Sequence, residues 1–252
     1  MSAIQPRVNL EKIRLTSSIV DEFVHNEFND CHTVRVAFRT LGSRKHEHYL
    51  NKYAAQFTRL PGEKRPAGAL THAEIILPVR PGVYVKGSVI KKRWSHKDEK
   101  GNDVYVPMGS FLKRTDPAEW ARKYIFVTIH ASREAIFKTL KFLATQNDGP
   151  FNNHGYYANL FVPGGIGTRQ FRNELLTHRT SFFCTELLVC ALQCLSMYDK
   201  PSQRIEDDED HWRQKIWTQN AAKSSPNSLY RVLKGAKGVM DDLPIGAQLQ
   251  IL

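Results

Sequence analysis

Cys184 is the residue of this chain whose position best suits a nucleophile. A run of apolar side chains at spacings of three and four predicts one helix face that begins near Ser181 to Cys184: Cys184, Leu187, Leu188, Ala191, Leu192 and Leu195. In the first turn of a helix, unpaired backbone N–H groups and the helix dipole favour the thiolate, the reactive form of cysteine. Cys184 also lies on the apolar face, so a buried structural cysteine is the alternative, and we assign Cys190 and Cys194 to the core.

A thiol nucleophile needs a base within hydrogen-bond reach, and ten histidines compete for that role. His72 is the best placed, because it opens the apolar strand predicted over Thr71 to Leu77 and could project from the sheet edge toward a helix terminus. His130, at the end of the strand predicted over Tyr124 to His130, is the second candidate. A structural role is the alternative for either histidine.

The elements that would position these residues are short strands followed by helices. Alternation of Val34, Val36 and Phe38 with arginines predicts a half-exposed strand from Thr33 to Leu41. Turn signals predict further antiparallel strands at 71–77, 82–91 and 104–107. Ser132 is placed to cap a helix that ends near 148–150, and Ser225 to cap a short final helix. We predict a polar, helix-compatible segment at 43–57 and a long surface loop at 151–179.

The composition indicates a globular protein with a core. The chain has 252 residues, 41% of them hydrophobic and 24% charged, and no apolar window of the length that crosses a membrane. We predict an N-terminal arm and first strand at 1–60, peripheral to a domain at 61–235, and a tail at 236–252. The four cysteines form neither a disulfide framework nor a zinc-site spacing, so we expect no metal, no cofactor and a cytoplasmic or other reducing intracellular location.

Positive charge is concentrated in two stretches, 35–65 and 86–100, of a chain whose formal net charge is +11. Such stretches could face an anionic partner such as a membrane, a nucleic acid or a capsid. A solvated basic face is the alternative, since no nucleic-acid motif with base-stacking aromatic residues accompanies the charge.

Four short blocks together resemble one family. Phe182-Phe-Cys-Thr-Glu-Leu-Leu188 resembles the Cys-Ser/Thr-Glu-Leu helix start of the permuted NlpC-like papain-fold hydrolases and acyltransferases, relatives of the lecithin retinol acyltransferase group. In that family a histidine that opens a strand precedes the cysteine, as in His72-Ala-Glu-Ile-Ile76. The segments 143–152 and 225–229 are similar to the family's connecting segments. The resemblance covers about residues 66–235.

The resemblance implies an α+β fold of the permuted papain-like type, with an antiparallel sheet packed against a helix whose N-terminus carries Cys184. It implies a hydrolase or acyl transferase that acts on an amide, ester or thioester through a Cys184 thioester, with His72 as general base. The family's third polar residue is not identified, because Tyr84, Lys86 and Ser88 are poor orienting groups and Glu74 could either orient His72 or solvate an edge. The alternative is a catalytically weak structural or interaction protein of the same fold, packaged in a virion or not, that uses its basic surface.

Overall fold

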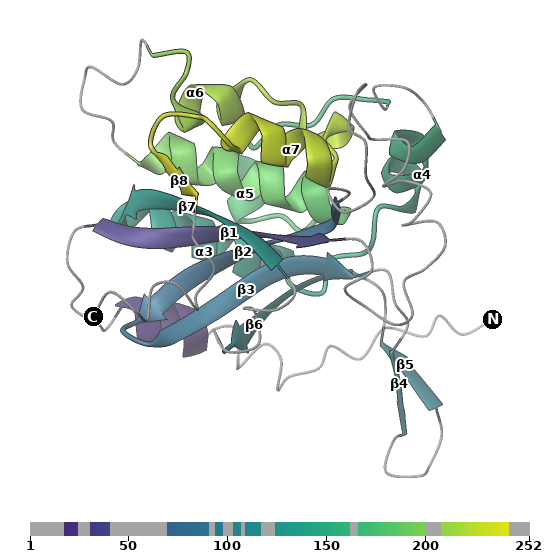
Figure 1. The fold of residues 1–252 in the computed structure, drawn as a ribbon. Coiled ribbons are helices and arrows are strands. Elements are labelled where there is room, and N and C mark those ends of the chain that lie inside the picture. Colours follow the sequence, from purple (N-terminus) through teal and green to yellow (C-terminus); the bar gives the residue numbers. More distant parts are fainter. Residues whose placement is uncertain are drawn as a thin grey trace.

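The chain folds as an α+β structure built on a six-stranded antiparallel sheet (Figure 1). The structure is a computed structural model that describes residues 18–24, 31–40, 70–90, 94–97, 103–106, 109–116, 124–161, 166–199 and 208–241. The strand order is β6-β3-β2-β1-β7-β8. Their bounds are β1 Cys31–Thr40, β2 Leu70–Arg80, β3 Val83–Ile90, β6 Gly109–Thr115, β7 Tyr124–Ser132 and β8 Val239–Asp241. A separate hairpin joins β4 (Trp94–Lys97) to β5 (Asp103–Val106).

Helices cover one side of the sheet. Figure 1 shows α5 (Cys184–Tyr198), α6 (Trp212–Trp217) and α7 (Pro226–Leu233) together above the strands. The remaining helices are α3 (Arg133–Gln146), α4 (Asn153–Phe161), η3 (Asn173–Leu176) and η4 (Ala221–Lys223), and residues 18–24 are also helical. Ser132 and Ser225 cap α3 and α7, as the sequence predicts, because each side-chain oxygen accepts a hydrogen bond from the first turn of its helix.

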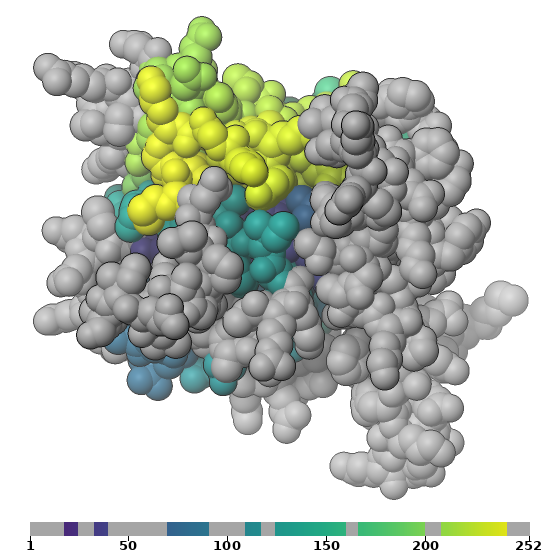
Figure 2. All heavy atoms as spheres, viewed as in Figure 1, coloured from purple at the N-terminus to yellow at the C-terminus, as the bar shows by residue number. Residues whose placement is uncertain are grey.

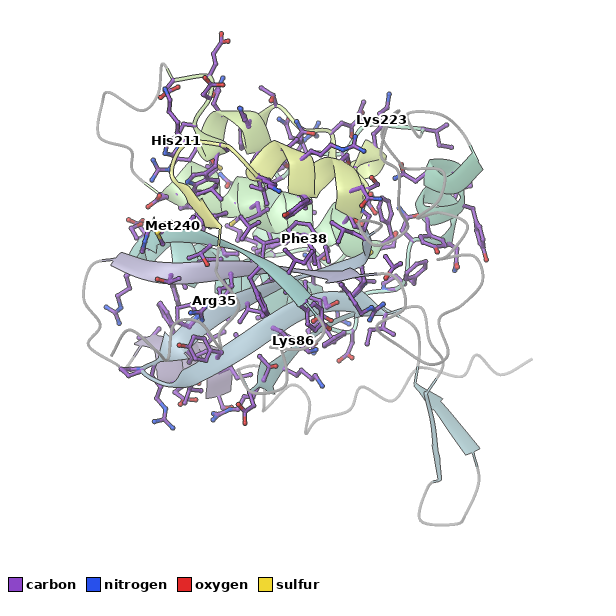
Figure 3. The ribbon with its side chains drawn as sticks, in the orientation of Figure 1. Arg35, Phe38, Lys86, His211, Lys223 and Met240 are labelled. Carbon is purple, nitrogen blue, oxygen red and sulfur yellow. The ribbon has the colours of Figure 1, made fainter. Side chains whose placement is uncertain are left out.

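The main core lies between the sheet and these helices. Alternate side chains of β1 and β2, such as Phe38 and Ile75, are fully buried there against α3, α5 and α7. Figure 3 shows Phe38 between β1 and α7, where its ring meets the edge of Tyr230, and Lys86 on the other side of the sheet. In the space-filling view of Figure 2, α7 and β8, in yellow, form part of the surface next to β7.

Several predicted elements need correction. The first strand, predicted as peripheral, lies inside the sheet between β2 and β7, and residues 239–241 of the predicted tail pair with β7 as β8. The predicted loop at 151–179 contains α4 and η3. The predicted segment at 43–57 and most of the basic stretch at 35–65 lie outside the described residues, as do residues 91–93 and 98–100 of the stretch at 86–100. No helix within the described ranges has the length and apolarity to cross a bilayer.

The pairing between β2 and β3 ends partway along both strands, and the candidate site lies beyond this point. The two strands pair from Arg80↔Val83 to Ile75↔Gly87 and pair no further, although β2 starts at Leu70 and β3 continues to Ile90. Beyond Gly87, β3 stays paired with β6. Among the described strands, the start of β2 pairs with β1, so its other edge can face a helix. Helix α5 packs against both β2 and β3.

Candidate active site

Cys184 is the first residue of α5 and is only partly buried. The side chain of His72 and the backbone of Ala73, both on β2, act on its thiol and lower its pKa. The Thr185 hydroxyl lies 3.7 Å from the sulfur. The helix start predicted from the apolar spacing is confirmed, and so is the placement of His72 near the start of a strand that faces it.

The His72 ring is held at Nε2 by two neighbouring side chains. Nε2 lies 3.2 Å from Oε1 of Glu74 and 2.8 Å from Oγ of Ser88. An ionised carboxylate can only accept hydrogen bonds, so the contact with Glu74 favours a proton on Nε2. Glu74 is thereby placed to orient the ring, as an acidic residue does beside a catalytic histidine.

Glu74 contacts a second basic residue, Lys86, in addition to His72. Nζ of Lys86 lies 3.2 Å from Oε2 of Glu74, so the carboxylate bridges a cation on each side. Glu74 and His72 are 4% and 7% exposed, which makes each unpaired charge costly. Lys86, Glu74, His72 and Cys184 thus form one row of ionisable groups, in which the charge of each group favours the opposite charge on its neighbour.

The contacts among Cys184, His72, Glu74 and Lys86 shift the pKa values of the first three residues. Burial acts to raise the pKa of Cys184, but the hydrogen bond and charge of His72, the Thr185 hydroxyl and the Ala73 amide outweigh it and lower the pKa. Burial acts to lower the pKa of His72, but its bonds to Cys184 and Glu74 raise it. The pKa of Glu74 is lowered, against the effect of burial, by His72 and Lys86. All three directions favour a thiolate–imidazolium pair held by an ionised carboxylate.

The backbone around the nucleophile is tied to α4. Phe182 donates its N–H to the carbonyl of Pro150 at 3.2 Å and accepts from the amide of Asn152 at 3.0 Å, forming a parallel bridge between 151 and 182. Asn152 directly precedes α4, which carries Tyr156 toward the site. Burial and the Cys184 thiolate both raise the pKa of Tyr156, so this hydroxyl stays protonated beside the thiol. This helix could not be predicted from the sequence, because its glycine and tyrosines lack a clear apolar period.

The other sequence candidates lie apart from this site. His130 is exposed on β7, which β1 separates from β2. Tyr84 packs with Ala37, Ile76 and Phe126 under the Arg35 guanidinium. Burial raises the pKa of Cys190 above its usual range and that of Cys194 to about 12, so neither is a reactive thiol.

Among the candidates that the sequence left open for the third residue, Glu74 and Ser88 contact His72, and Lys86 contacts Glu74. Within the described ranges, no group of three or more histidine, cysteine or acidic side chains is arranged to hold a metal ion. Comparison with protein-family models, with curated proteins and with solved structures finds no match to this chain. The functional interpretation consequently depends on the geometry of the site.

Proposed function

We propose that this protein is a thiol hydrolase or acyl transferase that works through a thioester on Cys184, with His72 as its general base and Glu74 as the residue that orients His72. The observation that carries the proposal is the placement of Cys184, at a helix N-terminus, beside His72, which lowers its pKa and whose ring contacts Glu74. A nucleophile, a base and an orienting group in this order are the arrangement that nucleophilic catalysis uses.

The reaction begins when the Cys184 thiolate attacks the carbonyl carbon of an amide, ester or thioester. A carbon–sulfur bond forms, and the carbonyl electron pair moves onto oxygen. The backbone N–H groups of the first turn of α5 have no acceptor within the helix, so that of Cys184 is available to the oxyanion. Leu187 is the residue whose N–H makes the first helical bond, to the carbonyl of Phe183.

Collapse of the tetrahedral intermediate breaks the bond to the leaving group, which takes a proton from the His72 imidazolium. The thioester remains on Cys184. Neutral His72 then removes a proton from water or from another acceptor, which attacks the same carbonyl and releases the thiolate. Glu74 stabilises the imidazolium in both halves of the cycle, as its contact with Nε2 requires.

We further propose that the fold is the permuted papain-like type. Its support is the order of the elements: the strand that bears the base, β2, precedes the helix that bears the nucleophile, α5, and an antiparallel sheet packs against that helix. This is the arrangement that the resemblance of residues 66–235 implies. The amide, ester and thioester substrates follow from the same resemblance.

The alternative, a catalytically weak structural or interaction protein, would use its basic surface to bind a membrane, a nucleic acid or a capsid. Three cations of the basic stretches have described side chains, Arg35, Arg39 and Lys86, and Arg39 is 6% exposed. Lys86 pairs with the buried Glu74, and the Arg35 guanidinium lies 5.7 Å from the centre of the Tyr84 ring. These contacts favour the enzyme.

The direct test is the site of acylation by a simple activated ester. We expect p-nitrophenyl acetate to release nitrophenolate in a burst and to leave an acetyl group on Cys184, located by peptide mass spectrometry after an acid quench. The Cys184→Ala variant gives the background rate. If acetyl groups are spread over lysines and the other cysteines, with no burst above that background, the hypothesis of a thiol enzyme is wrong. The alternative, a structural or interaction protein, would then be favoured.

A further inference from the structure

Glu186 is a buried carboxylate in the first turn of the nucleophile helix that the reaction itself does not use. It is 1% exposed. Its Oε2 accepts from the backbone N–H of Phe183 at 3.2 Å and from Nδ2 of Asn152 at 3.0 Å, while its Oε1 lies 3.2 Å from Nε of Arg169. Three donors from three separate segments thus meet on one side chain directly behind Cys184.

We propose that Glu186 is a positioning residue that sets where α5 begins and so holds the Cys184 thiol against His72. This role rests on the proposed function, because a position for the thiol matters only if the thiol reacts. All the partners of Glu186 are donors, and a carboxylate is the side chain that offers acceptors alone. A glutamine would turn an NH₂ group toward one of these donors and leave it unpaired.

The partners of Glu186 extend its hold over the residues that lead to the nucleophile. Arg169 also donates Nη1 to the carbonyl of Ser181, and its guanidinium lies 5.0 Å from the centre of the Phe182 ring. Asn152 holds the carbonyl of Phe182 through its own backbone amide. Ser181, Phe182 and Phe183 are therefore each fixed by Glu186 or by one of its partners.

The position of the thiol determines its reactivity. The low pKa of Cys184 depends on bonds to His72 and to the Ala73 amide, which both come from β2, whereas Glu186 controls only the α5 side of that contact. A small shift of the helix start lengthens both bonds together. Misplacement of a reacting group by about 1 Å can cost up to about a hundredfold in rate, even when the altered residue does not touch the substrate.

Asp199 provides a matched control at the other end of the same helix. It caps the C-terminus of α5, is 4% exposed, pairs with Arg213 and accepts from the backbone amide of Ser132 at 2.8 Å. Asp199→Asn therefore removes a buried charge of the same kind from the same helix without touching the nucleophile turn. Glu186→Gln and Asp199→Asn should lower Tm by similar amounts.

The experiment measures iodoacetamide labelling of Cys184 against pH in the whole protein, together with Tm. In Glu186→Gln we expect labelling at pH 7 to slow by about tenfold and the apparent thiol pKa to rise by about one unit, since tenfold corresponds to one unit. In Asp199→Asn the labelling profile should match that of the wild-type protein. If Glu186→Gln does not fold, Arg169→Gln tests the same contact and should move the profile in the same direction.

Two results would overturn the proposal, and they differ from each other. If Glu186→Gln lowers Tm but labels Cys184 as the wild-type protein does, the residue is structural only, and the proposed function stands. If wild-type Cys184 itself labels as an ordinary thiol, the proposed function fails and the positioning role fails with it.

Discussion

Replacing His72 with alanine is expected to slow acylation of Cys184 at neutral pH by about 10²- to 10⁴-fold, the contribution usual for a general base. The imidazole both stabilises the thiolate and supplies the proton for the leaving group, and no other base contacts the sulfur among the partners of Cys184. The measurement is the burst of nitrophenolate from p-nitrophenyl acetate, together with the acetyl group on Cys184.

His130→Ala is the matched control for this loss. The residue is also a histidine at the end of a strand of the same sheet, but it is exposed and lies on β7, with β1 between it and β2. Its replacement should leave the burst rate within about twofold of wild type, because surface substitutions change stability by no more than about 0.5 kcal/mol. Equal losses in the two variants would contradict the role of His72 as base.

Glu74→Gln is expected to slow acylation by about 10²- to 10³-fold, somewhat less than loss of the ring. The amide cannot balance an imidazolium, and it leaves the Lys86 ammonium, now 3.2 Å from a neutral group, without its buried counter-ion. Replacing the equivalent acidic residue of a serine protease triad costs about 10⁴-fold for a related reason, the loss of the correct tautomer. The same burst assay measures the effect.

The stability and activity of Glu74→Gln should change with pH in directions set by the pKa shifts of His72 and Glu74. His72 has a raised pKa, so its pairing stabilises the fold fully below its ordinary pKa of about 6.5, and this stabilisation is lost as pH rises through the folded value. Glu74 has a lowered pKa, so its contribution is present above about pH 4.3 and is lost as pH falls below that. In Glu74→Gln the alkaline limit of activity should move to lower pH, and the acid loss of Tm should become shallower.

The Ser88→Ala variant distinguishes the effect of the Ser88 hydroxyl on His72 from that of the Glu74 carboxylate. Ser88 also contacts Nε2 of His72, at 2.8 Å, but it carries no charge. Its loss removes one neutral hydrogen bond, and we expect acylation to slow by no more than about tenfold, the equivalent of the 0.5–1.5 kcal/mol that such a bond contributes. A larger loss in Ser88→Ala than in Glu74→Gln would show that the hydroxyl, not the carboxylate, orients the ring.

The positions of Cys184 at a helix start and of His72 near a strand start could be predicted because both signals are local, whereas their pairing was expected from the family resemblance. The apolar spacing from Cys184 to Leu195 defines the helix and its start, and the strand that opens beside His72 is an equally short pattern. Ser132 and Ser225 were predictable as caps for the same reason, since a cap depends on residues within one turn.

The third residue could not be assigned from sequence because it depends on strand pairing. Glu74 shares a strand face with His72, but so would any residue two positions away. The role proposed for Glu74 depends on its contact with the His72 ring and on Lys86, which reaches it from β3. The place of β1 inside the sheet was also missed, because its pairing with β7 joins segments about 90 residues apart in the chain.

The contacts of Glu186 could not be predicted, because its partners Asn152 and Arg169 are distant from it in the sequence. Asn152 and Arg169, which bind its carboxylate, come from a region that its composition marks as a loop. Glycine, asparagine and tyrosine in this region gave no helical period, yet α4 forms there and is anchored by backbone bonds to Phe182. Tertiary contacts of this kind override local propensity.

The most direct test of the site is the pH dependence of alkylation at each cysteine of the wild-type protein, followed residue by residue by mass spectrometry. Cys184 should react fastest, with an apparent pKa below the ordinary thiol value of about 8.5, whereas Cys190 and Cys194, whose pKa values burial raises, should stay unlabelled until the protein unfolds. Slow labelling of all three at the same rate, with no inflection below pH 8.5, would contradict the thiolate–imidazolium pair.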